Sequence, residues 1–322
     1  RLIKQVDVVV WNATDAQVAE MKLDQESLQK INPNVILCQL DCFSGIRPGP
    51  KTNYLGYDDL VQACTGIMQR FGGSMDRVEE HAHVGTIDVM CGFGGALGVA
   101  AALYQRQRSG RVGRPKTSLS ALSGLAQIPF CYDYQGRGLF NEPSGPDVRG
   151  YSALEHLYEA ADGWMMLACS ERDVPVLESV VGPLPEGDAQ REAQLKTVFS
   201  GRSRHEWVEL LQHNNLAAAP CGQMEALRTE YSRPFDNTCG VELGTYAFSI
   251  YPDHPAGRRV VQLDACAVRS TRAPLIAPQP SEKYGASTRA VLNELGYSGE
   301  EIDKMIAQGA ASESWSEEYF PS

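Results

Sequence analysis

The sequence lacks the cysteine and histidine spacings that are typical of metal sites and redox motifs. Nine cysteines are scattered along 322 residues without a C-x-x-C pair, and the six histidines form no H-E-x-x-H or related arrangement. Zinc sites require such spacings, and a chain of this length does not need disulfides to hold its core. We therefore predict no metal site and reduced cysteines that serve mainly in packing.

Long apolar runs and an excess of positive charge are also missing. No run reaches the roughly 18 apolar residues of a membrane span, and the opening residues enter a strand pattern without the regions of a signal peptide. The chain holds 29 Lys and Arg against 40 Asp and Glu, a net charge of −11, which on average repels a phosphate backbone. With 43% hydrophobic residues, we predict a globular cytoplasmic protein with no nucleic-acid or membrane partner.

The first forty residues predict a β-α-β unit. Residues 6–11 are dense in valine, which suits a parallel strand buried on both faces, and residues 35–40 repeat that pattern. Between them, Thr14 with Gln17 matches a capping box, and Asp24 marks a second helix start. Asn12, Ala13 and Thr14 then follow the carboxyl end of the first strand, where ligands bind in parallel sheets. The alternative is that these three residues only cap the helix.

Later segments predict further elements around one linker. Residues 141–150, NEPSGPDVRG, are rich in glycine, proline and polar residues and are the clearest linker in the chain. We predict a domain boundary there. The other expected elements are a helix at 60–69, a strand and helix within 109–128, a strand at 162–170, a helix at 204–216, a hairpin at 244–265 and a terminal helix with a capping box at Ser298 and Glu301 and a stop at Gly309.

Residues 83–111 hold a glycine-rich stretch that invites two interpretations, a dinucleotide-binding loop or a closely packed helix. The fingerprint of such a loop is G-x-G-x-x-G followed about 20 residues later by an acidic residue. Gly92 and Gly94 begin the pattern, but Leu97 occupies the third glycine position, and the later region reads RSGRVGR. Both requirements fail, which argues against a nicotinamide dehydrogenase.

The packed helix accounts for the same glycines. Gly94, Gly98, Ala101 and Ala102 are spaced so that they share a helix face where another backbone can approach closely. Cations in YQRQR suit the last helical turn, and Gly110 suits the stop. The stretch thus predicts a helix of about 20 residues with Asp88 at its start.

Asp88 has two interpretations. Aspartate is among the preferred N-cap residues, so a purely structural cap is one. The other is a nucleophile, since a carboxylate at a helix N-terminus and beside apolar neighbours is kept ionised by the dipole yet partly desolvated.

Several segments taken together resemble family III CoA-transferases. They are VDVVVWN, LDQESLQKINPNVILCQLDCFSG, GYDDLVQACTGIM, VGTIDVMCGFGGALGVAAALYQRQRSGR, DGWMMLACS, RSRHEWVELLQ and YGASTRAVLNELGYSGEEIDKMIAQG, in order along nearly the whole chain. The resemblance implies an α/β fold, in which a Rossmann-like parallel sheet domain, residues 1–145 and 241–322, is interrupted by a smaller α+β domain, residues 146–240. It also implies an interlinked homodimer.

The resemblance also implies a chemistry. The aspartate matching Asp88 attacks an acyl-CoA thioester, forms an anhydride and then an aspartyl-CoA thioester, and a small carboxylate finally takes the CoA. CoA or acyl-CoA is bound as a substrate, with no tightly bound cofactor. Asn12, Ala13, Thr14 and Tyr57 are the residues expected to contact it.

The sequence departs from the family in four places. Family members begin with roughly a quarter of the large domain before the segment VDVVVWN, so we expect this chain to be part of a longer, fused chain. Ala13 and Thr14 stand where an aromatic and a basic residue are frequent, and Glu20 stands where an arginine is frequent. CSERDVP replaces a glycine-rich lid.

Three alternatives remain at this point. Racemases of the same family place a histidine at the position of Tyr57, so transfer is favoured over racemisation; His81 and His83 lie in a polar loop and are expected to be solvated. A non-catalytic CoA-binding or dimerisation module is the second alternative, and the disfavoured dehydrogenase is the third. A narrower resemblance is to fused enzymes that transfer CoA to dimethylsulfoniopropionate and then eliminate dimethyl sulfide.

Overall fold

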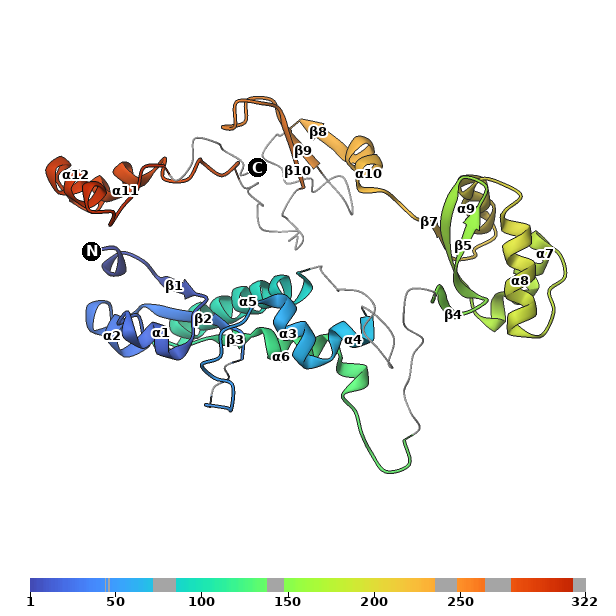
Figure 1. Cartoon of the computed structure of the whole chain (residues 1–322), viewed down its shortest axis with the longest axis horizontal. Helices are drawn as coiled ribbons and strands as arrows, with labels where there is room; N and C mark the ends of the chain where they lie inside the picture. The colour runs from blue at the N-terminus through green and yellow to red at the C-terminus, as the bar shows by residue number, and fades with distance from the viewer. Residues whose placement is uncertain are drawn as a thin grey trace. The chain divides into compact units, whose positions relative to one another are not determined.

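The structure, a computed structural model, describes residues 1–43, 45, 47–71, 85–137, 148–234, 248–263 and 279–314. The chain divides into two compact units, Arg1–Ala219 and Pro220–Ser322 (Figure 1). The predicted domain boundaries near residues 145 and 240 fall within 138–147 and 235–247, outside the described residues, and stay predictions.

The N-terminal part of the first unit is built on a parallel sheet. Its strands are β1 (Val8–Trp11), β2 (Ile36–Asp41) and β3 (Lys116–Ser118), in the order β1-β2-β3. A short 3-10 turn, η1 (Leu2–Lys4), precedes β1, and α1 (Asp15–Glu20) and α2 (Gln25–Ile31) connect β1 to β2. Both pairs of neighbouring strands are parallel, so the predicted β-α-β unit and the α/β class are confirmed.

The two predicted helix starts are confirmed as well. Thr14 is the N-cap of α1, and its hydroxyl and the side chain of Gln17 form the capping box. Asp24 is the N-cap of α2 and accepts a hydrogen bond from the Ser27 amide at 3.0 Å. These contacts satisfy amide groups that the first turn of a helix leaves unpaired.

The prediction that the first strand is buried on both faces is wrong. Val10 is 55% exposed, because, among the described residues, only the opposite face of β1 is packed. There, Val9 and Trp11 pack against a core cluster that includes Val18 and Leu28 of α1 and α2.

Two helices replace the single one predicted at 60–69. They are α3 (Asp58–Thr65) and α4 (Ile67–Phe71), separated by Gly66. Gly66 has φ +90°, a left-handed conformation that ends α3. The last helices of this part are α5 (Thr86–Ser109), α6 (Leu119–Ala126) and the 3-10 turn η2 (Ile128–Phe130). The strand and helix expected within 109–128 are thereby confirmed.

Helix α5 packs on the sheet through small residues, as predicted. A Cβ on Gly95 would lie 2.6 Å from Leu40 Cδ2, and one on Gly98 would lie 2.8 Å from Pro115 Cβ. Gly94, which the sequence had favoured, has only an ordinary contact with Thr117 at 3.5 Å. Helix α5 ends at Gly110, which has φ +69°.

Helix α5 is the one helix in the described part of the chain that is long and apolar enough to cross a membrane, by length and composition alone. The core helix of a globular α/β protein meets the same criterion, and Ile87, Cys91, Gly95 and Ala102 of α5 are buried. One such helix is weak evidence for a membrane span.

The rest of the first unit is a small α+β assembly. Its four-stranded sheet has the order β4 (Gly150–Ser152), β5 (Glu155–Ala160), β6 (Gly163–Ala168), β7 (Ala218–Pro220). Its helices are η3 (Glu171–Asp173), α7 (Val174–Val181), α8 (Asp188–Phe199) and α9 (Arg204–His213). Tyr158, Phe199 and Trp207 lie in its core, and the predicted strand at 162–170 and helix at 204–216 are confirmed.

The second unit carries the predicted hairpin and terminal helix. Its elements are α10 (Met224–Tyr231), β8 (Ser232–Pro234), β9 (Phe248–Tyr251), β10 (Val260–Leu263), α11 (Thr288–Glu294) and α12 (Gly299–Ala307). β9 and β10 pair antiparallel, and Ser298 and Glu301 form the capping box of α12. Gly309 follows with φ +70°.

Candidate active site

Asp88 is the third residue of α5, and not its N-cap. The N-cap is Gly85, which has no side chain to offer a hydrogen bond. The interpretation of Asp88 as a structural cap is therefore wrong, because the helix begins two residues before it. The Asp88 carboxylate projects from the first turn and is exposed to solvent.

Asp58 supplies the cap that Gly85 lacks. Its Oδ2 accepts a hydrogen bond from the backbone amide of Asp88 at 2.8 Å. Asp58 is the first residue of α3 and is buried, and its Oδ1 accepts a hydrogen bond from Gln62 Nε2 one turn later. Asp58 was not among the site residues predicted from the sequence. Its only local signal is the acidic pair in GYDDL, which marks a helix start but not a partner 30 residues away.

The charges around Asp88 favour its protonated form. Partial desolvation raises the pKa of the Asp88 carboxyl above its ordinary value, and the negative charges of Asp58 and Asp59 raise it further. The carboxylate remains open to solvent, so these effects are weakened by screening. A more basic carboxylate is a stronger nucleophile, as long as it is deprotonated at the working pH.

Two thiols lie near this carboxylate and stay protonated. Burial raises the pKa of Cys91 to about 11, with smaller contributions from the charges of Asp88 and Asp41. Burial, Asp41 and Asp88 also raise the pKa of Cys42, whose Sγ donates to the carbonyl of Gly56 at 2.8 Å. Neither thiol is prepared as a nucleophile, since the thiolate is the reactive form.

The first turns of α5 pack against buried apolar side chains. Ile87 and Cys91 are buried in a cluster with Val61, Ile67 and Leu119. Asp88 follows Ile87 directly and therefore lies at the rim of this cluster. β2 ends at Asp41, whose charge acts on Cys91, so the N-terminus of α5 lies at the carboxyl edge of the parallel sheet.

Asn12, Ala13 and Thr14 follow β1 at the same edge. Buried Gln39 donates from Nε2 to the carbonyl of Ala13 at 2.8 Å, which fixes this loop from the sheet side. The Thr14 hydroxyl is used in the capping box, and Asn12 is exposed. The helix-cap interpretation thus holds for Thr14, and contacts of the loop with a substrate stay a prediction.

Tyr57 is the N-cap of α3 and is 59% exposed. It directly precedes Asp58, so the Asp58–Asp88 hydrogen bond brings the GYDD segment to the predicted nucleophile. His81 and His83 lie within 72–84, outside the described residues.

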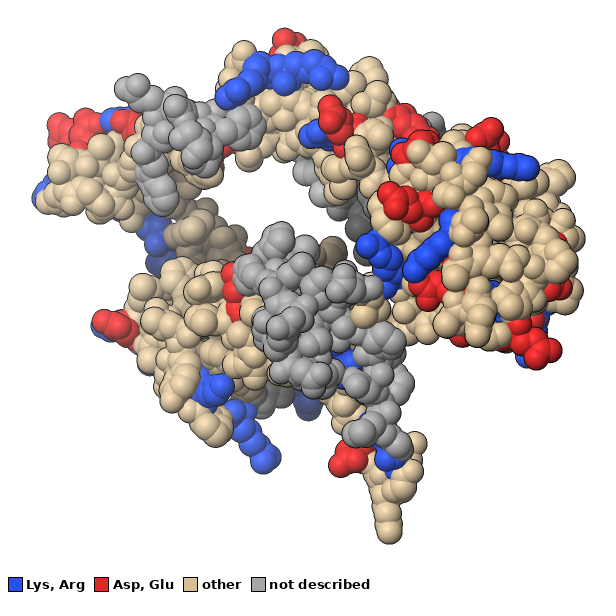
Figure 2. All heavy atoms as spheres, turned by 45° about the vertical axis from the view of Figure 1, so that its right-hand side comes forward, with Lys and Arg blue, Asp and Glu red and all other residues tan. Residues whose placement is uncertain are grey.

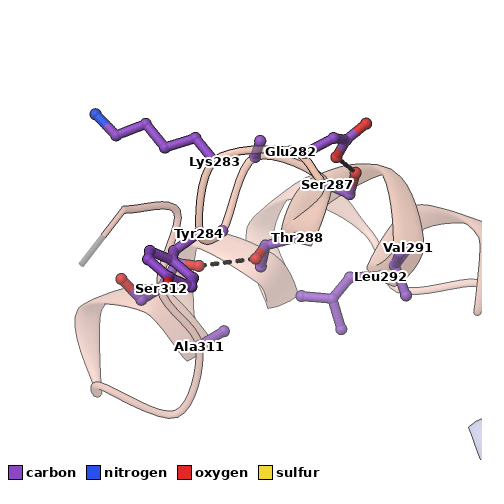
Figure 3. A pocket seen from close by; sticks show the side chains of 11 residues that line it. Glu282, Lys283, Tyr284, Ser287, Thr288, Val291, Leu292, Ala311 and Ser312 are labelled. Carbon is purple, nitrogen blue, oxygen red and sulfur yellow. Dashed lines mark hydrogen bonds between the residues drawn. The ribbon is translucent and has the colours of Figure 1, made fainter. Parts of the chain in front are cut away.

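Other features of the described residues do not involve the predicted site residues. The segment CSERDVP forms η3, in which Ser170 and Asp173 make a capping box. A groove in the second unit is lined by Tyr284, Val291 and Leu292, and Thr288 donates there to the carbonyl of Ser312 at 2.8 Å (Figure 3). Within the described ranges, no three His, Cys, Asp or Glu residues are grouped so that they could hold a metal ion.

The surface charges are mixed. On the face drawn in Figure 2, Lys and Arg side chains lie among Asp and Glu side chains over the small α+β assembly at the right. In the same assembly, the buried Arg191 forms an ion pair with the exposed Glu171, with 2.7 Å between Arg191 Nη1 and Glu171 Oε1.

A family model described as CoA-transferase family III matches residues 1–233. The chain belongs to this family. Its relatives include the CoA-transferase/lyase DddD of a Marinomonas species, 45% identical over 100% of this chain and 38% of its own length. They also include a succinate–glutarate CoA-transferase of Agrobacterium fabrum, 25% identical over 92% of this chain and 74% of its own length. The chain therefore spans well under half of the Marinomonas protein and about three quarters of the other.

A racemase belongs to the same set of relatives. The α-methylacyl-CoA racemase of Mus musculus is 25% identical over 94% of this chain and 78% of its own length. Among solved structures, a CAIB/BAIF family protein from Brucella suis superposes with a TM-score of 0.71 at 22% identity, covering 91% of this chain and 76% of its own. At this identity the likeness supports the fold alone.

Proposed function

We propose that this protein moves CoA from an acyl-CoA to a carboxylic acid with Asp88 as the covalent nucleophile. The observation that carries the proposal is the exposed Asp88 carboxylate in the first turn of α5, at the carboxyl edge of the sheet, with its pKa raised by its surroundings. Membership of CoA-transferase family III supplies the reaction class.

The proposed reaction exchanges acyl groups through Asp88. Its carboxylate attacks the thioester carbonyl of the donor, and the CoA thiolate leaves as the mixed anhydride forms. The thiolate then attacks the aspartyl carbonyl, which releases the donor acid and leaves an aspartyl-CoA thioester. The acceptor carboxylate attacks that thioester and expels the CoA thiolate, so that a second mixed anhydride forms. The thiolate finally attacks the acceptor acyl carbonyl of this anhydride, which forms the acceptor-CoA thioester and releases the Asp88 carboxylate.

Substituting Asp88→Asn tests this mechanism. Asparagine has nearly the same shape and leaves the backbone amide for Asp58, but its amide is a poor nucleophile. We expect CoA transfer to fall by several orders of magnitude, measured as the steady-state rate from acetyl-CoA. The circular-dichroism spectrum of the variant should match that of the wild-type protein.

Trapping the proposed aspartyl intermediate with hydroxylamine tests the mechanism directly. Wild-type protein incubated with acyl-CoA and then hydroxylamine should carry a hydroxamate on the peptide that contains Asp88, detected by mass spectrometry, and the Asn variant should not. A modification on another peptide during turnover would contradict the mechanism.

We further propose dimethylsulfoniopropionate as an acceptor, followed by elimination of dimethyl sulfide. The 45% identity to a protein named CoA-transferase/lyase supports this choice. Elimination requires a base for the α-proton, and Asp88 is free as a carboxylate once the acceptor holds the CoA.

An acceptor panel checks this proposal. With acetyl-CoA as donor, we expect dimethylsulfoniopropionate to give a CoA ester and dimethyl sulfide, read by chromatography of both products. Succinate and glutarate serve as comparison acids. Faster transfer to either of them, with no dimethyl sulfide released, would assign a different acceptor.

Two alternatives predict different results. A non-catalytic module would bind CoA without transfer, and calorimetry with CoA beside the rate assay separates such a module from a CoA-transferase.

A racemase requires a second acid–base group opposite Asp88, and Tyr57 offers a phenol where the racemases place a histidine. Exchange of the α-proton of a 2-methylacyl-CoA in deuterated water would favour racemisation.

A further inference from the structure

The inference concerns Asp58 and rests on the proposed role of Asp88. We propose that Asp58 is a positioning residue for the nucleophile: its buried carboxylate caps α5 from another helix and holds a fixed negative charge beside Asp88.

The hydrogen bonds define what Asp58 does. A helix leaves its first amides unpaired, and Gly85 offers no side chain to pair them. Asp58 Oδ2 accepts from one of these amides, that of Asp88 itself, at 2.8 Å. The bond therefore fixes the backbone from which the nucleophile projects.

The other Asp58 oxygen is held within its own helix. Gln62, which is also buried, donates from Nε2 to Oδ1 across one turn of α3. With both oxygens engaged, the Asp58 carboxylate has a defined orientation. A cap of this kind links α3 to α5, two helices that contact each other in the core beneath the site.

The charge of Asp58 also acts against the helix dipole. The N-terminus of α5 carries partial positive charge, which stabilises an adjacent carboxylate and makes it less basic. Among the described residues, the charges that act on Asp88 are those of Asp58 and Asp59 of α3. The thiols on which the Asp88 charge acts are Cys42, directly after β2, and Cys91 of α5. Because the thiols are protonated, the formal charges of the described residues that act on Asp88 are negative. Asp58 thus keeps the nucleophile basic while it fixes its position.

Two variants separate these effects. Asp58→Asn retains a carbonyl oxygen for the Asp88 amide, and Gln62 can turn its own amide to accept from the new side chain, so only the charge is lost. Asp58→Ala loses both the charge and the cap. Asp24→Asn is the matched control, since Asp24 caps α2 through the Ser27 amide in the same way and does not face Asp88.

The readout is the pH profile of kcat together with KM for acyl-CoA. For Asp58→Asn we expect the acid limb to move to lower pH, kcat on the plateau to fall about tenfold and KM to stay unchanged. Asp58→Ala should lose a further factor of about ten, since the first turn of α5 loses its cap. Asp24→Asn should keep the wild-type profile.

An Asp58→Asn protein with the wild-type kcat and acid limb would overturn the positioning role, even if Asp58→Ala fails to fold. That result is distinct from failure of the proposed function, in which Asp88→Asn itself would retain transfer. The rate of hydroxamate formation at Asp88 in single-turnover trapping gives a second reading, and we expect it to slow with kcat in both Asp58 variants.

Discussion

At the scale of single residues, Asp88 is placed where its charge is unfavourable. Desolvation and the charges of Asp58 and Asp59 raise its pKa in the folded chain. Folding therefore favours its protonated form. The proposed transfer chemistry needs the deprotonated form, so the position that suits the proposed nucleophile lowers stability at neutral pH.

The raised pKa of Asp88 in the folded chain predicts how stability depends on pH. At pH 7, Asp88→Asn should raise the free energy of unfolding, by no more than about 0.5 kcal/mol because the exposed side chain is screened by solvent. The gain should shrink as the pH falls through the raised pKa and disappear by about pH 3, below both the folded and the unfolded pKa, where the aspartate is neutral in both states. Urea unfolding at several pH values measures it. A variant that is less stable than wild type at pH 7 would contradict this account.

At the scale of elements, α5 combines close packing with an exposed apolar side. Gly95 and Gly98 let the helix approach Leu40 and Pro115. Val89, Phe93, Leu97 and Tyr104, by contrast, are 58–73% exposed. Glycine costs about 1 kcal/mol in a helix interior, and contact with the sheet offsets that cost only where the glycine faces it.

Two glycines of this helix should therefore respond in opposite ways to alanine. Gly98→Ala places a Cβ 2.8 Å from Pro115 Cβ. We expect it to destabilise the chain by about 1 kcal/mol, because the strain exceeds the gain in helix propensity. Gly92→Ala meets nothing within 4 Å and should stabilise by about 0.5–1 kcal/mol. Urea unfolding compares the two, and equal shifts would show that α5 does not approach the sheet as closely as described.

At the scale of the whole molecule, the family resemblance implies an interlinked homodimer, with residues 1–145 and 241–322 as one domain and 146–240 as the other. We predict that the protein sediments as a dimer at micromolar concentration and that dilution of the active protein does not release monomers. Sedimentation velocity over a hundredfold range of concentration measures this. A stable monomer with full transfer activity would exclude the interlinked arrangement.

The sequence by itself determined the features that depend on neighbours a few residues apart. The predicted capping boxes of Thr14 with Gln17 and Ser298 with Glu301 both form, because both partners lie within one helical turn. The apolar segments 6–11 and 35–40 predicted two parallel strands, which form as β1 and β2. The failed glycine fingerprint argued against a dinucleotide-binding loop and for a helix, which forms as α5. Asp88 could be singled out as a candidate because an aspartate at a helix start is visible without the fold.

The tertiary structure decided which faces meet. The sequence favoured Gly94 as a close contact, but Gly95 is the one that faces Leu40, and a one-residue difference on a helix turns the contact by about 100°. Val10 is exposed because, among the described residues, only the opposite face of β1, that of Val9 and Trp11, is packed, which no local pattern states. One of the two interpretations of Asp88 made it the cap of α5, yet Asp58, which lies on a different helix, accepts the hydrogen bond from the Asp88 amide. That hydrogen bond exists only because α3 and α5 pack against each other, and packing between distant segments is set by the whole core rather than by local spacing.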